Sequence, residues 1–233
     1  MNKIGIVTMG TGKYVNFLTK MLTSFSNYFL PEYEKQFIVL TDDKSFSHPS
    51  ITNNIYFPFY EWPYSTLYKN KAINLTKKYF DCDIVFWVDA DLKCIDYVER
   101  HEDILPTKNI PVCCVEHCGW LYEEKEIKLY PYELNPKSKA FVKDIYKVPY
   151  HQACLYGGLY NNFFNMSQII EKNIDIDLTN DIVAVWHDES HLNRYIQDIP
   201  FKTIPKIYAR PEAMGELLPN TKIISIIKPN LNI

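Results

Sequence analysis

Apolar runs alternate with amphipathic segments along the first ninety residues of the chain. Unbroken apolar runs of about four to eight residues are typical of buried strands, whereas apolar residues three and four apart predict helices. Such alternation favours an α/β fold with an open, mostly parallel sheet that is covered by helices on both faces. The pattern predicts strands over residues 4–8, 36–42, 55–59 and 84–88, and helices over residues 14–29 and 65–80.

The pattern is less regular in the second half of the chain. The charged, proline-containing segment from Tyr122 to Pro149 predicts a mobile loop. No repeat or low-complexity linker divides the chain, so we expect a single domain over residues 1–233. Further elements are expected as strands over residues 110–115 and 151–158, a helix over residues 165–173, and a helix from Asp188 to Ile196.

Composition and charge narrow the possible partners. The chain has 18 Tyr, 13 Phe and 4 Trp, and aromatic faces suit stacking on sugar rings and bases. The formal net charge is −3 without a basic block, so we expect no nucleic-acid partner. No apolar run approaches the roughly 18 residues of a membrane span, and nothing resembles a signal peptide.

The six cysteines include no Cys-x-x-Cys pair, so they predict reduced thiols and a cytoplasmic protein. Cys113 and Cys114 lie in an apolar run, which favours core positions. A zinc site formed by Cys113, Cys114, His117 and Cys118 is an alternative, although this spacing matches no standard tetrahedral pattern.

Asp89 and Asp91 follow the buried run from Ile84 to Val88 and are the first candidates for chemistry. Side chains two apart in extended backbone point to the same side, so both carboxylates are expected to face together. Like charges this close repel unless a cation lies between them, and such oxygen ligands suit Mg²⁺ or Mn²⁺. The alternative is a strand end followed by an aspartate-rich turn without a ligand.

The turn from Met9 to Gly12 lies between a predicted strand and a predicted helix, as in many nucleotide-binding units. Its glycines complete no known phosphate-binding motif. A dinucleotide fingerprint needs glycine at Val15, and a phosphate loop needs Ser or Thr where Tyr14 stands. A nucleotide bound here would therefore be held through its base and ribose.

A second group of candidate functional residues lies around Asp188 and Glu189, at the start of a predicted helix. Acids at a helix start either cap the helix and complement its dipole or carry chemistry. His187 and His191 are four apart, a spacing that puts two zinc ligands on one helix face. A zinc-protease helix, however, needs glutamate directly after the first histidine, and Glu189 comes two residues after it.

The segment Trp186-His187-Asp188-Glu189-Ser190-His191-Leu192-Asn193 resembles the signature of family 6 retaining glycosyltransferases, the histo-blood-group A and B transferases and α-1,3-galactosyltransferases. The chain's start at the catalytic strand resembles the compact bacterial and viral-type members. Further similar blocks occur in the family's order: Lys13-Tyr14-Val15 with Phe17-Leu18, Trp62 with Lys69, Val88-Asp89-Ala90-Asp91, His117 with Gly119, Tyr132-Glu133 with Pro136, Ser138 and Ala140, and Gly157-Gly158.

The resemblance implies a GT-A fold and metal-dependent α-1,3 transfer of a sugar from a UDP-sugar to a glycan acceptor, with retained configuration. It places nucleotide binding in residues 1–96, and acceptor binding and catalysis in residues 97–233. Glu189 would be the nucleophile or would stabilise the transition state. Asp89 and Asp91 would hold Mn²⁺ or Mg²⁺. The implied donor-binding residues are Met9, Gly10, Thr11, Tyr14, Trp62, Lys69, Asp89, Ala90, Asp91, Gln152, Ala153, Cys154, Asp188 and Lys228, and the implied acceptor-binding residues are His117, Trp120 and Trp186.

Two positions depart from the family's usual residues. Lys69 stands where an arginine is common. The lysine ammonium cannot form the paired hydrogen bonds that a planar arginine guanidinium makes to a carboxylate or phosphate. Cys154 is larger than the usual glycine or alanine, which favours galactose over N-acetylgalactosamine, with glucose also possible. The residues after Ile204 match poorly, so the acceptor stays open. A sugar-binding protein without turnover and a UDP-sugar hydrolase are the alternatives.

Overall fold

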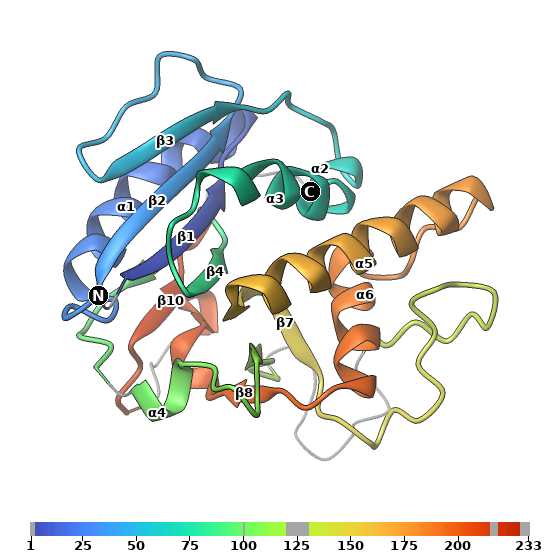
Figure 1. Ribbon diagram of the computed structural model, residues 1–233. Coiled ribbons are helices and arrows are strands. Elements are labelled where there is room, and N and C mark those ends of the chain that lie inside the picture. The colour runs from blue at the N-terminus through green and yellow to red at the C-terminus, as the bar shows by residue number, and fades with distance from the viewer. Residues whose placement is uncertain (1–2, 100, 120–130, 215–218, 229–233) are drawn as a thin grey trace.

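The computed structural model describes residues 3–99, 101–119, 131–214 and 219–228 (Figure 1). The strands are β1 (Lys3–Met9), β2 (Glu34–Thr41), β3 (Ile51–Tyr56), β4 (Ile84–Val88), β5 (Leu92–Cys94), β6 (Val112–Glu116), β7 (His151–Leu159), β8 (Lys202–Ile204), β9 (Arg210–Pro211) and β10 (Ile223–Ser225). The α-helices are α1 (Val15–Tyr28), α2 (Tyr64–Leu67), α3 (Lys69–Thr76), α4 (His101–Ile104), α5 (Tyr160–Thr179) and α6 (His187–Tyr195).

Seven strands form the main sheet in the order β3-β2-β1-β4-β7-β6-β8. The first four strands in this order run parallel, so their carboxyl ends meet at one edge of the sheet. Strand β7 is antiparallel to both of its neighbours and therefore begins at that same edge, beside the end of β4. A smaller sheet has the order β5-β10-β9.

Strand β4 has apolar cores on both of its faces, which confirms the interpretation of its unbroken apolar run. Phe86 and Val88 pack into one core, which contains the apolar stripe of α1 and part of the small sheet. Val85 and Trp87 pack into the other core, against α3, α5 and α6. Helices therefore cover both faces of a mostly parallel sheet, as the alternation predicted (Figure 1).

Several predicted boundaries were wrong. The third strand lies at Ile51–Tyr56, ahead of the expected residues 55–59, because its alternating half-exposed pattern lacks an apolar run. The expected helix over residues 65–80 is split into α2, α3 and a 3-10 turn at Lys77–Tyr79. Helix α5 extends well beyond residues 165–173 at both ends. The short elements β5, α4, β8, β9 and β10 were not predicted, because two to four residues show no periodicity.

The described part of the segment predicted as a loop, residues 131–149, contains no helix or strand. The Ser138 hydroxyl donates to Asp177 Oδ2 on α5 at 2.5 Å, and the Lys139 amide donates to Oδ1 at 2.7 Å. Tyr132 and Val142 are buried in a small separate core. These contacts fix the segment against α5; the rest of the predicted loop lies outside the described residues.

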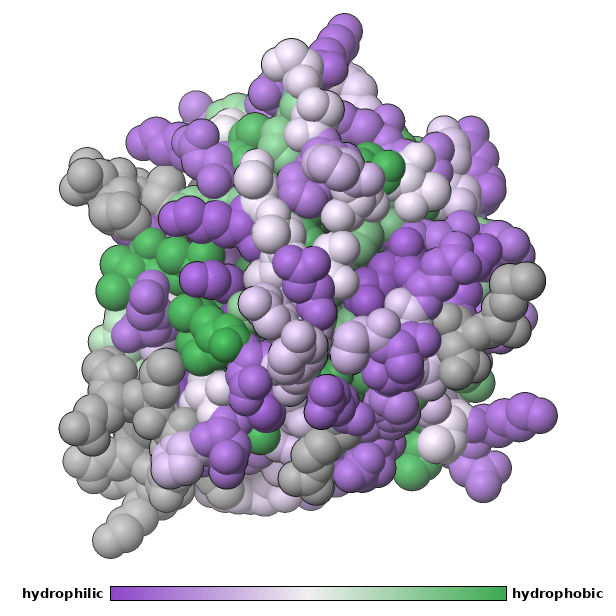
Figure 2. All heavy atoms as spheres, turned by 90° about the vertical axis from the view of Figure 1, so that its left-hand side faces the viewer, coloured by the Kyte–Doolittle hydropathy of each residue, from purple (hydrophilic) through white to green (hydrophobic). Residues whose placement is uncertain are grey.

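The face that carries the edge strand β3 and the beginning of β1 is mainly hydrophilic, with apolar side chains in small separate groups (Figure 2). Its polar character fits the partial exposure along β3. None of the described helices has the length and apolar character needed to cross a membrane. All six cysteines are free thiols, and Cys113 and Cys114 are fully buried, as expected.

Candidate functional site

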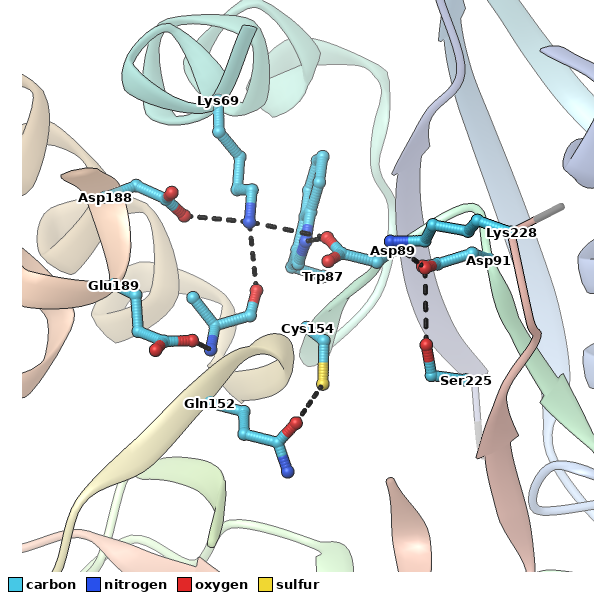
Figure 3. A network of polar contacts seen from close by, with 11 residues as sticks. Lys69, Trp87, Asp89, Asp91, Gln152, Cys154, Asp188, Glu189, Ser225 and Lys228 are labelled. Carbon is cyan, nitrogen blue, oxygen red and sulfur yellow. Dashed lines mark hydrogen bonds and ion pairs between the residues drawn. The ribbon is translucent and has the colours of Figure 1, made fainter. Parts of the chain in front are cut away.

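The two aspartates that follow β4 lie in a turn rather than in extended backbone. The Leu92 amide donates to the Asp89 carbonyl at 3.1 Å, which closes the turn. The Asp89 amide donates to the Cys154 carbonyl at 2.9 Å, which ties the turn to β7. The expected strand-like alternation of Asp89 and Asp91 is therefore wrong, although both carboxylates lie at the carboxyl end of β4 (Figure 3).

Asp91 is held by the small sheet. Its side chain is almost fully buried, and its carboxylate lies 2.6 Å from the Lys228 ammonium and 3.3 Å from the Ser225 hydroxyl (Figure 3). The Ile226 amide also donates to the Asp91 carbonyl at 2.9 Å. Burial and the neighbouring Asp89 charge raise the pKa of Asp91, while Lys228 opposes them. The site thus holds two acids close enough to repel each other.

The two carboxylates fit a divalent cation. Each is in contact with a cationic side chain, since Lys69 Nζ lies 3.4 Å from Asp89 Oδ1 and Lys228 Nζ contacts Asp91. These ammonium groups show that positive charge is favoured at this position. No group of three or more His, Cys, Asp or Glu ligands occurs within the described residues. Mg²⁺ commonly binds through one or two carboxylates, with phosphates and water completing its shell, and the donor set matches that pattern.

Lys69 connects the acids of the β4 turn to helix α6. Its ammonium lies 2.8 Å from Asp188 Oδ2 and donates to the Ala153 carbonyl at 3.0 Å (Figure 3). Burial alone lowers the pKa of Lys69, but the charges of Asp188 and Asp89 outweigh it and raise the pKa well above its usual value. The Asp188 carboxylate therefore pairs with lysine and does not cap α6, which begins one residue earlier without a side-chain cap.

Lys69→Met is expected to lower the free energy of unfolding by about 3–5 kcal/mol, because it leaves Asp188 buried without its counter-charge. Both side chains of the pair are less than one tenth exposed. Lys71→Met, an exposed position on the same helix, serves as the control and should change stability by less than about 0.5 kcal/mol. Urea unfolding of both variants measures the difference; equal stability of the two would contradict a structural ion pair.

Glu189 lies in the first turn of α6 and faces the beginning of β7. Its Oε2 accepts a hydrogen bond from the Ala153 amide at 2.8 Å (Figure 3). Burial raises the pKa of Glu189 to about 7, although the hydrogen bond from the Ala153 amide acts in the opposite direction. A carboxylate with this pKa can act as a nucleophile or exchange a proton near neutral pH.

Asn193 fixes the position of α6 against β7. Its side-chain Oδ1 accepts from the His151 amide at 2.9 Å, and its Nδ2 donates to the His151 carbonyl at 2.8 Å. The side chain thus pairs with the backbone of β7 as a neighbouring strand would. Because Asn193 is one helical turn after Glu189, this pairing sets the distance between the Glu189 carboxylate and Ala153.

The turn after β1 reaches the same edge of the sheet. Gly12 has φ +54°, a left-handed conformation that favours glycine, and its amide donates to the Asp42 carboxylate at the end of β2. A Cβ at Gly10 would lie 2.6 Å from Leu18, so glycine permits α1 to pack close to the turn. The Lys228 ammonium lies 5.2 Å from the centre of the Tyr14 ring, which places Tyr14 near Asp91.

Other predicted residues lie around this centre or face away from it. Trp62 is 65% exposed and packs edge to face against His187, beside the start of α6. The Gln152 amide donates to two backbone carbonyls, Glu116 and Ala209, and so points away from the acids. Met9, Thr11 and Ala90 are buried or half-buried, Cys154 is half-buried with its thiol near Gln152, Trp186 is exposed, and Trp120 lies outside the described residues.

The predicted acceptor residue His117 is largely buried and packs edge to face against the Tyr150 ring at 5.6 Å. Burial lowers the pKa of His117 to about 4, so the ring is neutral at physiological pH. Burial and the neighbouring Glu189 charge raise the pKa of Tyr150, so His117 and Glu189 are both neighbours of this one side chain. A neutral ring here can accept or donate a hydrogen bond without adding charge.

Neither zinc alternative is supported within the part of the chain that the structure describes. Cys113 and Cys114 are successive strand residues that pack into opposite cores, so they cannot share one ion. His191 lies 3.5 Å from Asp177 on α5, whereas His187 packs against Trp62. The two histidines of α6 therefore face different neighbours.

Sequence reasoning missed several side chains of the site. Trp87 hydrogen-bonds Asp89, and Asn193 hydrogen-bonds the backbone of His151. Asp42 accepts from the Gly12 amide, Ser225 contacts Asp91, and Tyr150 is close enough to Glu189 for its charge to raise the tyrosine pKa. Two of them carried a usable signal: Trp87 lies in the buried run directly before Asp89, and Asn193 stands in the family-like segment of α6. A cavity of about 480 Å³ is lined by Pro136 and Ser138 of one family-like block, but by none of the acids Asp89, Asp91, Asp188 and Glu189.

Comparison with known proteins identifies relatives of this chain. The family model described as Glycosyltransferase family 6 matches residues 61–228. The O-antigen biosynthesis glycosyltransferase WbnI of Escherichia coli is 27% identical over 228 residues, with 91% of this chain and 90% of WbnI covered. The globoside alpha-1,3-N-acetylgalactosaminyltransferase 1 of Gallus gallus is 26% identical over 202 residues, covering 82% of this chain and 57% of that protein.

The histo-blood group ABO system transferase 1 of Rattus norvegicus is 25% identical over 208 residues, which cover 83% of this chain and 56% of the transferase. The chain thus spans less than two thirds of these two animal relatives. The matched region contains Lys69, both acids of the β4 turn, and Asp188 with Glu189. The mostly parallel sheet with helices on both faces also agrees with the expected GT-A architecture. Since the family model matches well over half of the sequence, the chain belongs to glycosyltransferase family 6.

Proposed function

We propose that this protein transfers galactose from UDP-galactose to a glycan acceptor in α-1,3 linkage, with retention of configuration and with Mn²⁺ or Mg²⁺ as cofactor. One observation carries the proposal: Lys69 joins Asp89 to Asp188, and the adjacent Glu189 lies against β7 at the same edge of the sheet. The site therefore combines a cation-binding pair with a carboxylate of raised pKa, which are the two requirements of this chemistry.

The donor would lie across the carboxyl ends of β1 and β4. The turn at Gly10 and Thr11, with the Tyr14 ring, offers a surface for the uracil base and ribose. Asp89 and Asp91 would hold the metal ion, which acts as a Lewis acid toward the diphosphate. Lys228, which contacts Asp91, is placed to bind the negative diphosphate when the donor is present.

The sugar would lie between the β4 turn and the first turn of α6. Asp188 is fixed by Lys69, so its carboxylate is held in place to accept hydrogen bonds from sugar hydroxyls. Glu189 would face the β side of the anomeric carbon. There it would act as the nucleophile of a double displacement or stabilise the positive charge of an oxocarbenium-like transition state.

Cys154 supports the choice of galactose. Its thiol projects beside Gln152 at the start of β7, directly after Ala153, the residue that contacts Lys69 and Glu189 (Figure 3). A cysteine here leaves less space for an N-acetyl group than glycine does. The exposed ring of Trp186, one residue before α6, offers an apolar face for the acceptor sugar.

The activity should depend on pH through Glu189. Burial raises the pKa of this carboxyl to about 7, and only the ionised form can serve as nucleophile or charge stabiliser. We expect kcat/KM to fall about tenfold per unit as the pH drops below about 7, because kcat/KM reports ionisations of the free enzyme. A rate profile at saturating metal measures this; a flat profile between about pH 5 and pH 7 would contradict the role of Glu189.

The function is tested by a donor screen with UDP-galactose, UDP-N-acetylgalactosamine and UDP-glucose against a panel of glycans. We expect sugar transfer from UDP-galactose with Mn²⁺, loss of transfer with EDTA, and an α-1,3 product in the linkage analysis. UDP release without any acceptor sugar would instead identify a hydrolase, and UDP-sugar binding without release would identify a binding protein.

A further inference from the structure

We propose that the indole of Trp87 is a positioning residue that orients Asp89 so that one carboxylate oxygen is held and the other is left for the metal ion. This role rests on the proposed metal site. The structure supports it through a direct hydrogen bond, since Trp87 Nε1 donates to Asp89 Oδ1 at 2.6 Å (Figure 3).

Trp87 is itself held rigidly. It is 1% exposed and is packed in the core formed by α3, α5, α6 and β7. A buried indole N–H normally finds a hydrogen-bond partner, because an unmade bond in the core is costly. Here the partner is the carboxylate two residues later, directly past the end of β4. The core fixes the indole ring. Through its hydrogen bond, the ring restricts the motion of the Asp89 side chain, which is one third exposed.

Both donors that contact Asp89 meet the same oxygen. Lys69 Nζ lies 3.4 Å from Oδ1, the atom that also accepts from Trp87, and this ammonium lies 5.2 Å from the centre of the indole ring. Among the described residues, no donor contacts Asp89 Oδ2. The carboxylate is therefore prevented from rotating while one oxygen is free for a ligand.

The indole differs from the lysines in charge. A cation entering between Asp89 and Asp91 is repelled by Lys69 and must displace or move Lys228 from Asp91. The neutral N–H of Trp87 orients its carboxylate without opposing the incoming charge. Groups that hydrogen-bond a metal-ligating side chain without touching the metal commonly contribute about 10–100-fold to metal affinity. Trp87 would be such a group for Asp89.

The test is a titration of the full-length protein with Mn²⁺, in which the EPR signal of free Mn²⁺ reports binding, in the absence and presence of UDP. One variant replaces Trp87 by benzothienylalanine, which keeps the ring shape and exchanges the N–H for sulfur; the second is Trp87→Phe. We expect both to weaken Mn²⁺ binding by about tenfold or more. UDP binding without metal should stay at its wild-type value, which a general disruption of the site would not allow.

Phe86→Leu is the matched control, because Phe86 is the preceding buried aromatic of β4 and faces the opposite core. It should lower the melting temperature to an extent similar to Trp87→Phe while Mn²⁺ affinity stays at the wild-type value. Wild-type Mn²⁺ affinity in the benzothienylalanine variant would overturn the role of Trp87 and leave the proposed metal site intact. No Mn²⁺ binding by the wild-type protein, even with UDP, would overturn the metal site and this role together.

Discussion

Replacing Glu189 by glutamine is expected to lower kcat by at least about a thousandfold and to leave the affinity for UDP nearly unchanged. Glutamine has the same size as glutamate, and its carbonyl oxygen can still accept the hydrogen bond from the Ala153 amide. The substitution removes the negative charge that is needed when the bond to the leaving UDP breaks. An interaction made mainly in the transition state affects kcat rather than ligand binding.

The measurements are steady-state transfer rates and calorimetric binding of UDP with Mn²⁺. Glu34→Gln is the control, because Glu34 is an exposed acid at the opposite end of the sheet, where it pairs with Lys3. This variant should keep wild-type rates. A Glu189→Gln enzyme with more than about a tenth of wild-type kcat would remove Glu189 from the reaction, and weaker UDP binding would point to a binding role.

Asp91→Asn is expected to abolish the stimulation of transfer by Mn²⁺ and to reduce activity by at least about a hundredfold. Asparagine keeps the size of the side chain and an oxygen that can accept from Ser225. It lacks the charge that a divalent cation needs from this buried position, where Asp91 is only 4% exposed. Rates measured over a series of Mn²⁺ concentrations give the apparent metal affinity of each variant.

Asp96→Asn is a matched control for this experiment. Asp96 also pairs with a lysine, Lys222, and lies just beyond β5, but its side chain is about half exposed. We expect its metal dependence to equal that of the wild type. If Asp91→Asn retained normal activation by Mn²⁺, the ion pair of Asp91 with Lys228 would be structural and the metal ligands would have to be sought elsewhere.

The elements that sequence reasoning identified are those with a strong local pattern. Strand β4 was predicted at its observed limits, because five apolar residues in a row bury both of its faces. The strands of the small sheet were missed, because each is two or three residues long and is stabilised by pairing with segments that are distant in sequence. Their existence depends on tertiary contacts that no local window contains.

The same distinction applies to the site. The acids of the β4 turn were recognisable from their position after a buried strand. Two features were not visible: the ion pair of Lys69 with Asp188 joins residues far apart in the chain, and the contact of Glu189 with Ala153 depends on the antiparallel register of β7. The alternative in which Asp188 caps its helix does not hold, because Lys69 on α3 is the partner of its carboxylate.

Strand β10 pairs with β5 on one side and β9 on the other, so it cannot slide without breaking both sets of backbone hydrogen bonds. This double pairing fixes the reach of the segment that ends at Lys228, three residues past Ser225. One inserted or deleted residue in that stretch would shift the ammonium by about 3.3 Å, more than a contact of 2.6 Å tolerates. Among related sequences that retain the ion pair, the number of residues between the strand and the lysine should vary less than the identity of the residues between them.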